Sequence, residues 1–143
     1  MLKDSIFWLG IIGSAIGMEY WARYAHKEIW HKNLWFIHGS HHGEGKKFKG
    51  LELNDLFGLS HGIVAMELIF GGLRTNSAMM VGTGIGMTIY GGMYFIVHDG
   101  MIHGRIPVEF LMKFDIMKKI KEAHDKHHES GGLPYGLFLG MKE

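Results

Sequence analysis

The chain has 143 residues, including 11 His, 22 Gly, 11 Met and no Cys. This length is typical of one domain, which we expect to cover residues 1–143. The lack of Cys excludes disulfide scaffolds, zinc–thiolate fingers and iron–sulfur clusters. The net charge of +1 lacks the positive excess typical of nucleic-acid binding, so we expect no nucleic-acid partner.

Three apolar blocks predict membrane-spanning helices. The first, 5–22, has Glu19 as its only charged residue, the second, 56–73, has only Glu67, and the third, 78–97, has none. Each has the roughly 18–20 residues that a transmembrane helix needs. An ionisable group inside such a helix is costly and usually functional. The alternative, three buried helices of a soluble bundle, would normally show a polar stripe, which the third block barely offers.

Basic residues predict the orientation of these helices. Segments 23–49 and 105–126 each hold six Lys or Arg, whereas the link 73–77 holds one. The positive-inside rule therefore places both basic segments in the cytoplasm and the N-terminus outside. Within them, 43–50 predicts a flexible loop, and 108–126 predicts a fourth, partial or interfacial helix. The apolar face of that helix would consist of Phe110, Phe114, Met117 and Ile120.

Ten of the histidines fall into four clusters on the predicted cytoplasmic side. On an α-helix, H-x2-H-H places three imidazoles on one face, where they can converge on one point. Five residues turn an α-helix by about 140°, so H-x4-H needs a helix end, a kink or two different metals. Gly100 and Pro107 make a break plausible after His98, but no such breaker follows His26. The H-x4-H pairs are His26/His31 and His98/His103, and the H-x2-H-H clusters are His38/His41/His42 and His124/His127/His128.

These clusters predict a metal centre. Imidazole is a good ligand for Fe, Zn, Cu and Ni, and ten imidazoles exceed what one ion can bind, so two ions sharing them is the simplest interpretation. A metal-bound His usually donates its other nitrogen to a carboxylate or carbonyl. Glu28, Asp55, Asp99 and Asp125 are candidates for that role, although the first and last also fit a solvated surface charge. For His61, alone in the second block, a structural or supporting role is favoured over metal ligation.

Five segments resemble one known family: HKEIWHKNLWFIHGSHH (26–42), ELND (52–55), YGGMYFIVHDGMIHGRIP (90–107), AHDKHH (123–128) and YGLFLG (135–140). They are similar to the β-carotene 3-hydroxylases, the carotenoid branch of the fatty acid hydroxylase superfamily of membrane non-heme di-iron enzymes. The histidine boxes alone are shared with desaturases and other lipid hydroxylases. ELND and the segment around HDG narrow the resemblance to the carotenoid branch. His61 departs from the pattern, because an apolar residue is expected there.

The resemblance implies O2-dependent hydroxylation at C-3 of β-ionone rings, from β-carotene through β-cryptoxanthin to zeaxanthin. It implies two iron ions and electrons from a ferredoxin-type donor, although imidazoles bind zinc at least as readily as ferrous iron. No side chain is needed as a general base. The implied metal ligands are His26, His31, His38, His41, His42, His98, His103, His124, His127 and His128. The residues expected to support them are Asn54, Asp55, Asp99 and His61, and those expected to contact substrate are Tyr90, Tyr94 and Phe95.

We therefore expect an all-α integral membrane protein with three to four transmembrane or interfacial helices and a cytoplasmic-side, histidine-rich di-metal site. Gly13-x3-Gly17 and Gly82-x3-Gly86 predict close helix packing, with a narrow substrate groove as the alternative. The short N-terminus favours a bacterial inner membrane. Two other functions stay open: a hydroxylase or desaturase of another membrane lipid, such as a fatty acid or sterol, and a non-enzymatic membrane metal-binding protein, whose ligands would line a path through the membrane.

Overall fold

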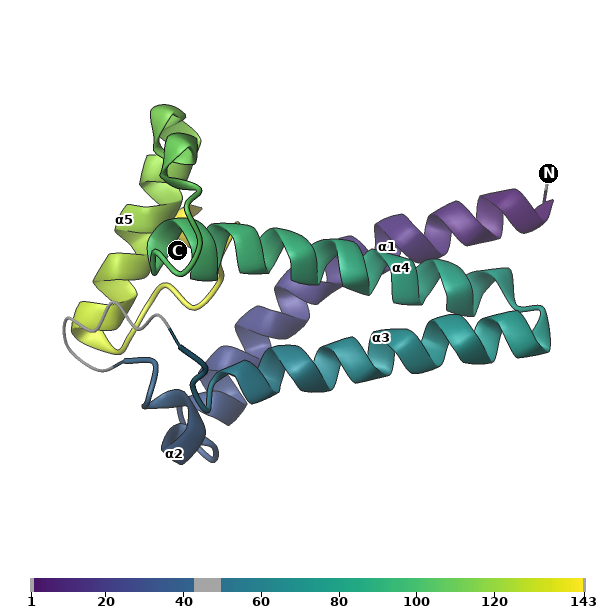
Figure 1. The fold of residues 1–143 in the computed structure, drawn as a ribbon, viewed down its shortest axis with the longest axis horizontal. Helices are drawn as coiled ribbons and strands as arrows, with labels where there is room; N and C mark the ends of the chain where they lie inside the picture. Colours follow the sequence, from purple (N-terminus) through teal and green to yellow (C-terminus); the bar gives the residue numbers. More distant parts are fainter. Residues whose placement is uncertain (1, 43–49, 143) are drawn as a thin grey trace. The chain divides into compact units, whose positions relative to one another are not determined.

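The computed structural model describes residues 2–42 and 50–142, so nearly all of the predicted loop at 43–50 lies outside the described residues. The described part is helical and contains no strand, which confirms the all-α expectation. In chain order the elements are α1 (Leu2–Ala25), η1 (His26–Trp30), α2 (Trp35–His38), α3 (Asp55–Thr75), α4 (Ala78–Tyr94), η2 (Phe95–Ile102), η3 (Glu109–Lys113), α5 (Asp115–Ser130) and η4 (Gly140–Lys142) (Figure 1).

The chain divides into two compact units. Unit 1 comprises Met1–Met18 and Leu56–Met93, and unit 2 comprises Glu19–Asp55 and Tyr94–Glu143. Unit 1 therefore holds most of the apolar helical sequence. Unit 2 holds all ten clustered histidines.

Two helices among the described residues, Asp55–Thr75 and Ala78–Ile102, are long and apolar enough to cross a membrane. They correspond to the second and third apolar blocks. The first block also forms a helix, α1, but it is not among those that meet the same test of length and hydropathy. Glu19 and the aromatic residues after it lower the mean hydropathy at that end of the helix.

Glycines let α4 approach both of its neighbours in unit 1. A Cβ at Gly82 or Gly86 would collide with backbone atoms of α1, and a Cβ at Gly84 would lie 2.6 Å from the Ala65 carbonyl oxygen in α3. α3 and α4 run side by side from the turn that joins them (Figure 1). Helix packing is therefore the observed role of Gly82-x3-Gly86.

The glycine spacing in α1 does not play the predicted part. A Cβ at Gly13 or Gly17 would meet open space, whereas one at Gly10 would lie 2.9 Å from the Met79 carbonyl oxygen. The prediction of close packing through Gly13-x3-Gly17 is wrong, because α1 turns a different face toward α4. Ser14 lies on that face and donates a hydrogen bond to the Thr83 carbonyl at 2.9 Å.

The helices widen where the H-x4-H pairs lie. η1 and η2 are π-helices, and the amides of His31 and His103 donate to the carbonyls of His26 and His98, each at 3.0 Å. A π-helix bonds residue i to residue i+5, so it brings both members of each pair to one side. Gly100 itself lies inside η2, which ends at Ile102 with His103 as its C-cap. The predicted helix end between His98 and His103 is therefore confirmed, but it lies after Gly100 and follows a π-turn.

The partial or interfacial helix predicted over 108–126 is present as two pieces, η3 and α5. The short 3-10 helix η3 ends before Phe114, whose extended backbone (φ −91°, ψ 130°) separates it from α5. Phe110 and Phe114 are 63% and 48% exposed, whereas the buried face of α5 carries Ile120, His124 and His127. Ile120 packs in the apolar core of unit 2 with residues of η2 and the C-terminal segment.

Candidate metal centre

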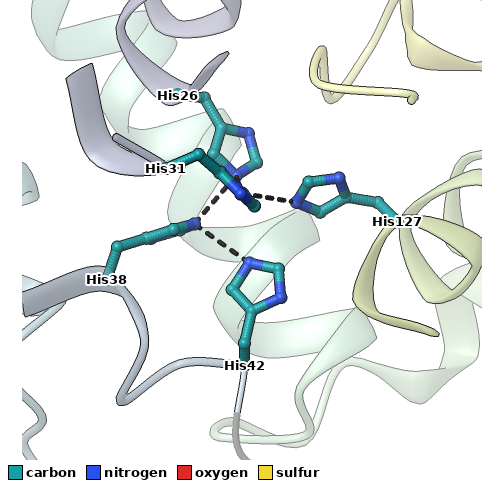
Figure 2. Close-up of side chains that lie close together, drawn as sticks. All are labelled: His26, His31, His38, His42 and His127. Atoms are coloured by element: carbon teal, nitrogen blue, oxygen red, sulfur yellow. Dashed lines mark hydrogen bonds between the residues drawn. The ribbon is translucent and has the colours of Figure 1, made fainter. Parts of the chain in front are cut away.

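Five histidines of unit 2 point their ring nitrogens toward one another. We call them group A: His26, His31, His38, His42 and His127, whose ligand atoms all lie within 4.8 Å of one another. Figure 2 shows four of them arriving from the N-terminal part of the chain and His127 from α5. The π-turn of η1 is what allows His26 and His31 to reach the same point.

The nitrogen spacing in group A suits a metal ion. The Nε2 atom of His38 lies 2.9 Å from that of His26 and 3.0 Å from that of His42. The His31 Nε2 lies 3.2 Å from the His26 Nε2 and 3.1 Å from the His127 Nε2. At metal–imidazole distances of about 2.0–2.1 Å, two ligands at right angles have nitrogens about 3.0 Å apart.

Hydrogen bonds made by Nδ1 indicate that Nε2 is the nitrogen that faces the centre of group A in three of these rings. The His26 Nδ1 donates to the Tyr135 carbonyl at 2.8 Å, and the His38 Nδ1 donates to the Asn54 Oδ1 at 2.7 Å. The His127 Nδ1 donates to the Gly132 carbonyl. A neutral imidazole that donates through Nδ1 has a bare lone pair on Nε2. Several such lone pairs facing one another repel unless a cation binds between them.

A second set, group B, has the same character: His41, His98, His103 and His124, also within 4.8 Å of one another. The Nε2 atoms of His41 and His98 are 3.1 Å apart, and those of His103 and His124 are 3.2 Å apart. The π-turn of η2 brings His98 and His103 together here.

His128 lies beside both groups. Its ring stacks on His42 with centroids 4.3 Å apart, and its centroid lies 4.6 Å from that of His124. Its Nε2 is the one buried side-chain nitrogen or oxygen without a hydrogen-bond partner in the described part of the chain. A buried nitrogen without a hydrogen-bond partner fits a metal ligand, because buried polar atoms otherwise have partners.

Each H-x2-H-H cluster is divided between the two groups. His38 and His42 belong to group A and His41 to group B, while His127 belongs to group A and His124 to group B. The expectation that each cluster converges on one point is wrong. His41 and His42 lie in turns after α2 rather than on one helix face. In α5, the His127 side chain joins group A and the His124 side chain joins group B. Two adjacent clusters of imidazole agree with the prediction of two ions.

Carboxylates accept hydrogen bonds from two imidazoles of group B. The His41 Nδ1 donates to the Glu52 Oε1 at 3.0 Å, and the His98 Nδ1 donates to the Asp99 Oδ2 at 3.3 Å. Arg105 joins this arrangement by donating from Nη1 to the Asp99 Oδ1 at 2.7 Å and to the Asp55 Oδ1 at 2.6 Å. Glu52, Asp55 and Asp99 form a compact acidic cluster, but because the guanidinium binds it, this cluster is an ion-pair network rather than a third metal site.

Burial keeps five of these imidazoles neutral. Burial, together with neighbouring imidazoles, lowers the pKa of His31 to about 4, of His38 and His128 to about 3, and of His42 and His103 to about 2. Neutral imidazole is the form that binds metal.

The predicted supporting residues differ in whether they contact the clustered histidines. Asn54 and Asp99 contact ligand candidates directly, whereas Asp55 acts one step away, through Arg105. Glu28 and Asp125 instead form surface ion pairs with Lys32 and Lys121. These two carboxylates face solvent, as the alternative interpretation allowed.

His61 lies outside both groups. It belongs to α3 in unit 1, where its Nδ1 donates to the Phe57 carbonyl at 2.7 Å. A hydrogen bond to the preceding turn of its own helix gives no support to the predicted role beside the metals.

The three predicted substrate contacts differ in exposure. The Tyr94 ring lies against His98 with centroids 4.6 Å apart. Phe95 is 47% exposed, whereas Tyr90 is buried in unit 1 at 4%.

Several residues of the site went unrecognised in the sequence. Glu52 stands in the quoted ELND segment and could have been chosen for its carboxylate. The acceptors at Tyr135 and Gly132 are backbone carbonyls, which carry no side-chain signal. Glu19, by contrast, was expected to matter as an ionisable group inside an apolar block. It is buried and accepts a hydrogen bond from the Leu139 amide at 2.8 Å, which ties α1 to the C-terminal segment.

The described part of the chain is helical and holds two adjacent histidine groups that could each bind a metal ion, which defines the class of a histidine-rich helical protein. The comparisons identify its family: a model of the fatty acid hydroxylase family matches residues 11–142, so the chain belongs to that family of enzymes. No solved structure matches it.

Similar proteins include carotenoid enzymes. The chain is 41% identical to "Beta-carotene 3-hydroxylase 2, chloroplastic" of Arabidopsis thaliana, over 92% of this chain and 45% of that protein. It is 44% identical to "Beta-carotene 3-hydroxylase, chloroplastic" of an Oncidium hybrid cultivar, over 92% of this chain and 44% of that protein. It is 38% identical to "Beta-carotene hydroxylase" of Pseudescherichia vulneris, over 99% of this chain and 80% of that protein. The chain thus spans less than half the length of these chloroplast relatives.

Proposed function

We propose that this chain is a β-carotene 3-hydroxylase that uses O2 to hydroxylate C-3 of β-ionone rings, converting β-carotene to β-cryptoxanthin and then zeaxanthin. The observation that carries this proposal is the pair of adjacent imidazole groups, A and B, in a chain similar over most of its length to proteins named for this activity. We treat residues 1–143 as one functional domain.

The metals of this proposal are two non-heme irons. Group A would hold one, and group B with His128 would hold the other, so all ten clustered histidines serve as ligands. When bound, the irons supply the O2 chemistry that no amino-acid side chain provides. The spacing, burial and neutral state of the imidazoles support this assignment, and the same ligands also suit zinc.

The protein's own residues orient the ligands and exclude water. Asn54 and the carbonyls of Tyr135 and Gly132 fix three rings of group A through their Nδ1 protons. Glu52 and Asp99 do the same for His41 and His98. Such outer partners set ring orientation and ligand basicity.

A substrate ring would approach beside Tyr94. The tyrosine ring already packs on His98, so a group that contacts it lies next to group B. Phe95, exposed next to it, offers further apolar surface. Tyr90 is the least supported of the three predicted contacts, because its side chain is buried.

A membrane location fits the apolar surface of unit 1. Large side chains along α1 and α3, such as Ile12, Leu59 and Phe70, are more than half exposed. Contiguous apolar surface of this kind is unusual in contact with water and typical of contact with lipid or a partner. We propose an inner-membrane protein of a bacterium, with the metal centre on the cytoplasmic side, which takes its carotenoid from the lipid and its electrons from a ferredoxin-type donor.

Pigment analysis tests the function. The chain is expressed in a bacterial strain that accumulates β-carotene, alongside His127→Ala, which removes a ligand candidate, and His61→Ala as a matched control. We expect β-cryptoxanthin and zeaxanthin from the wild type and the control, and neither from His127→Ala. Unchanged β-carotene from wild-type protein that has reached the membrane in iron-supplied cells refutes the carotenoid assignment. Fatty acid and sterol profiles would then test hydroxylation or desaturation of another lipid.

A metal-binding protein without catalysis is less well supported. A transport path would need ligands spread along the membrane-crossing helices. The ten clustered histidines instead gather in unit 2.

A further inference from the structure

The two histidine groups differ in the charge of the residues that hold them. In group A the Nδ1 acceptors are neutral: the Asn54 amide oxygen, 2.7 Å from His38, and the Tyr135 carbonyl, 2.8 Å from His26. The third Nδ1 acceptor, the Gly132 carbonyl that accepts from His127, is also neutral. In group B the known acceptors are carboxylates: Glu52 accepts from His41, and Asp99 accepts from His98.

The carboxylates beside group B are only partly neutralised. Glu52, Asp55 and Asp99 lie within 4.8 Å of one another, and Arg105 is the cation that contacts all three. Three carboxylates against one guanidinium leave negative charge next to group B. The Arg105, Glu52 and Asp99 side chains are only 11–13% exposed, so solvent and salt screen this charge weakly.

We propose that the two metal positions are inequivalent, and that group B binds a divalent cation first and more tightly than group A. This inference rests on the proposed function insofar as both groups bind metal. Two causes act in the same direction. The net negative charge attracts the cation, and an imidazole that donates to a carboxylate is a more basic ligand than one that donates to a neutral oxygen.

The number of imidazoles does not reverse this order. Group A has five histidines and group B has four, but His128 adds a fifth beside group B. Its ring centroid lies 4.9 Å from that of His41, 5.0 Å from that of His103 and 4.6 Å from that of His124. Its buried Nε2 has no hydrogen-bond partner in the described part of the chain, which suits a ligand role. The charge of the supporting residues is then the main difference between the groups.

Cobalt binding to the metal-stripped protein tests the proposal without needing catalysis. The purified full chain is titrated with Co2+ in competition with a chelator, and d–d absorption follows each step. Glu52→Gln and Asn54→Asp exchange the acceptor types of the two groups with side chains of nearly the same shape. Glu122→Gln and Asn33→Asp make the same charge changes at exposed positions and serve as matched controls.

We expect two binding steps in the wild type, separated by roughly tenfold or more in Kd. Glu52→Gln weakens the tighter step by about tenfold or more, as outer partners of metal ligands usually do, and leaves the weaker step unchanged. Asn54→Asp strengthens the weaker step, and both controls behave as the wild type.

Two equal steps in the wild type, or a Glu52→Gln effect confined to the weaker step, would overturn the proposed order. The hydroxylase assignment would stand in either case, because it requires two metals but no particular order of binding. Failure of the wild type to bind Co2+ would overturn this inference and the di-metal centre together. Failure to convert β-carotene, with the two steps intact, would overturn the proposed substrate alone.

Discussion

Arg105 offers the sharpest test of how the metal centre is held. Its guanidinium donates two hydrogen bonds to Asp55, at 2.6 and 2.8 Å, one to Asp99 at 2.7 Å and one to the Gly50 carbonyl at 2.9 Å. Arg105→Ala removes all four. It leaves Asp55 and Asp99 close together with Glu52 and without a cation.

The size of the effect follows from the charges. At an effective dielectric constant of about 20, a pair of charges about 4 Å apart interacts by about 4 kcal/mol. Desolvation of the guanidinium offsets much of the attraction within the ion pairs that it forms. Removal of one partner from a buried ion pair typically costs about 3–5 kcal/mol. For a chain of this length we expect a fall in Tm of about 10 °C.

The assay is thermal unfolding of the metal-stripped protein in detergent, with metal content after reloading as a second readout. Arg105→Lys keeps the charge but not the paired hydrogen bonds, so we expect an intermediate loss. In a double-mutant cycle, Asp55→Asn should recover part of the Arg105→Ala loss, with a coupling of about 1–3 kcal/mol. An Arg105→Ala protein with wild-type Tm, or effects that add without coupling, would refute the ion-pair reasoning.

Three further outcomes are expected. Gly82→Val drives a side chain into the α1 backbone and should lower stability by about 1–3 kcal/mol in thermal unfolding, whereas Gly13→Val, facing open space, should not; equal losses would contradict the packing argument. His42 and His103 have pKa values near 2 against an ordinary 6.5, so the unfolded chain binds protons that the folded one does not. Stability of the metal-free protein should therefore be full above about pH 6.5 and fall as the pH drops below it, which unfolding at pH 7.5, 6 and 5 would check. His61→Ala should retain wild-type metal content, measured by elemental analysis, and a lost ion would restore its predicted supporting role.

The sequence predicted much of the helical layout. Apolar runs marked the helices that became α3 and α4. The division of the predicted 108–126 helix into η3 and α5 was not predicted, because apolar periodicity persists across the extended residue Phe114.

The sequence predicted which residue type gathers at the site. It did not predict the local backbone or the hydrogen-bond partners of those residues. H-x4-H spacing indicated that something other than an α-helix was needed, yet a π-turn leaves no compositional mark at His26 or His98. Arg105 was counted only as a positive charge, because one partner, Asp55, lies 50 residues away in the sequence and the other, Asp99, is reached only through the turn that follows η2. Long-range ion pairs and backbone acceptors are tertiary properties.

The division of α5 between the groups has a consequence for how the centre can change. His124 and His127 lie one helical turn apart and serve different groups. Any slide or rotation of this helix therefore displaces ligands of both groups at once. A single inserted residue between them would swing one of the two by about 100°. A change in α5 therefore cannot move the histidines of one group alone. We expect insertions to be tolerated in the surrounding loops and excluded from this one turn.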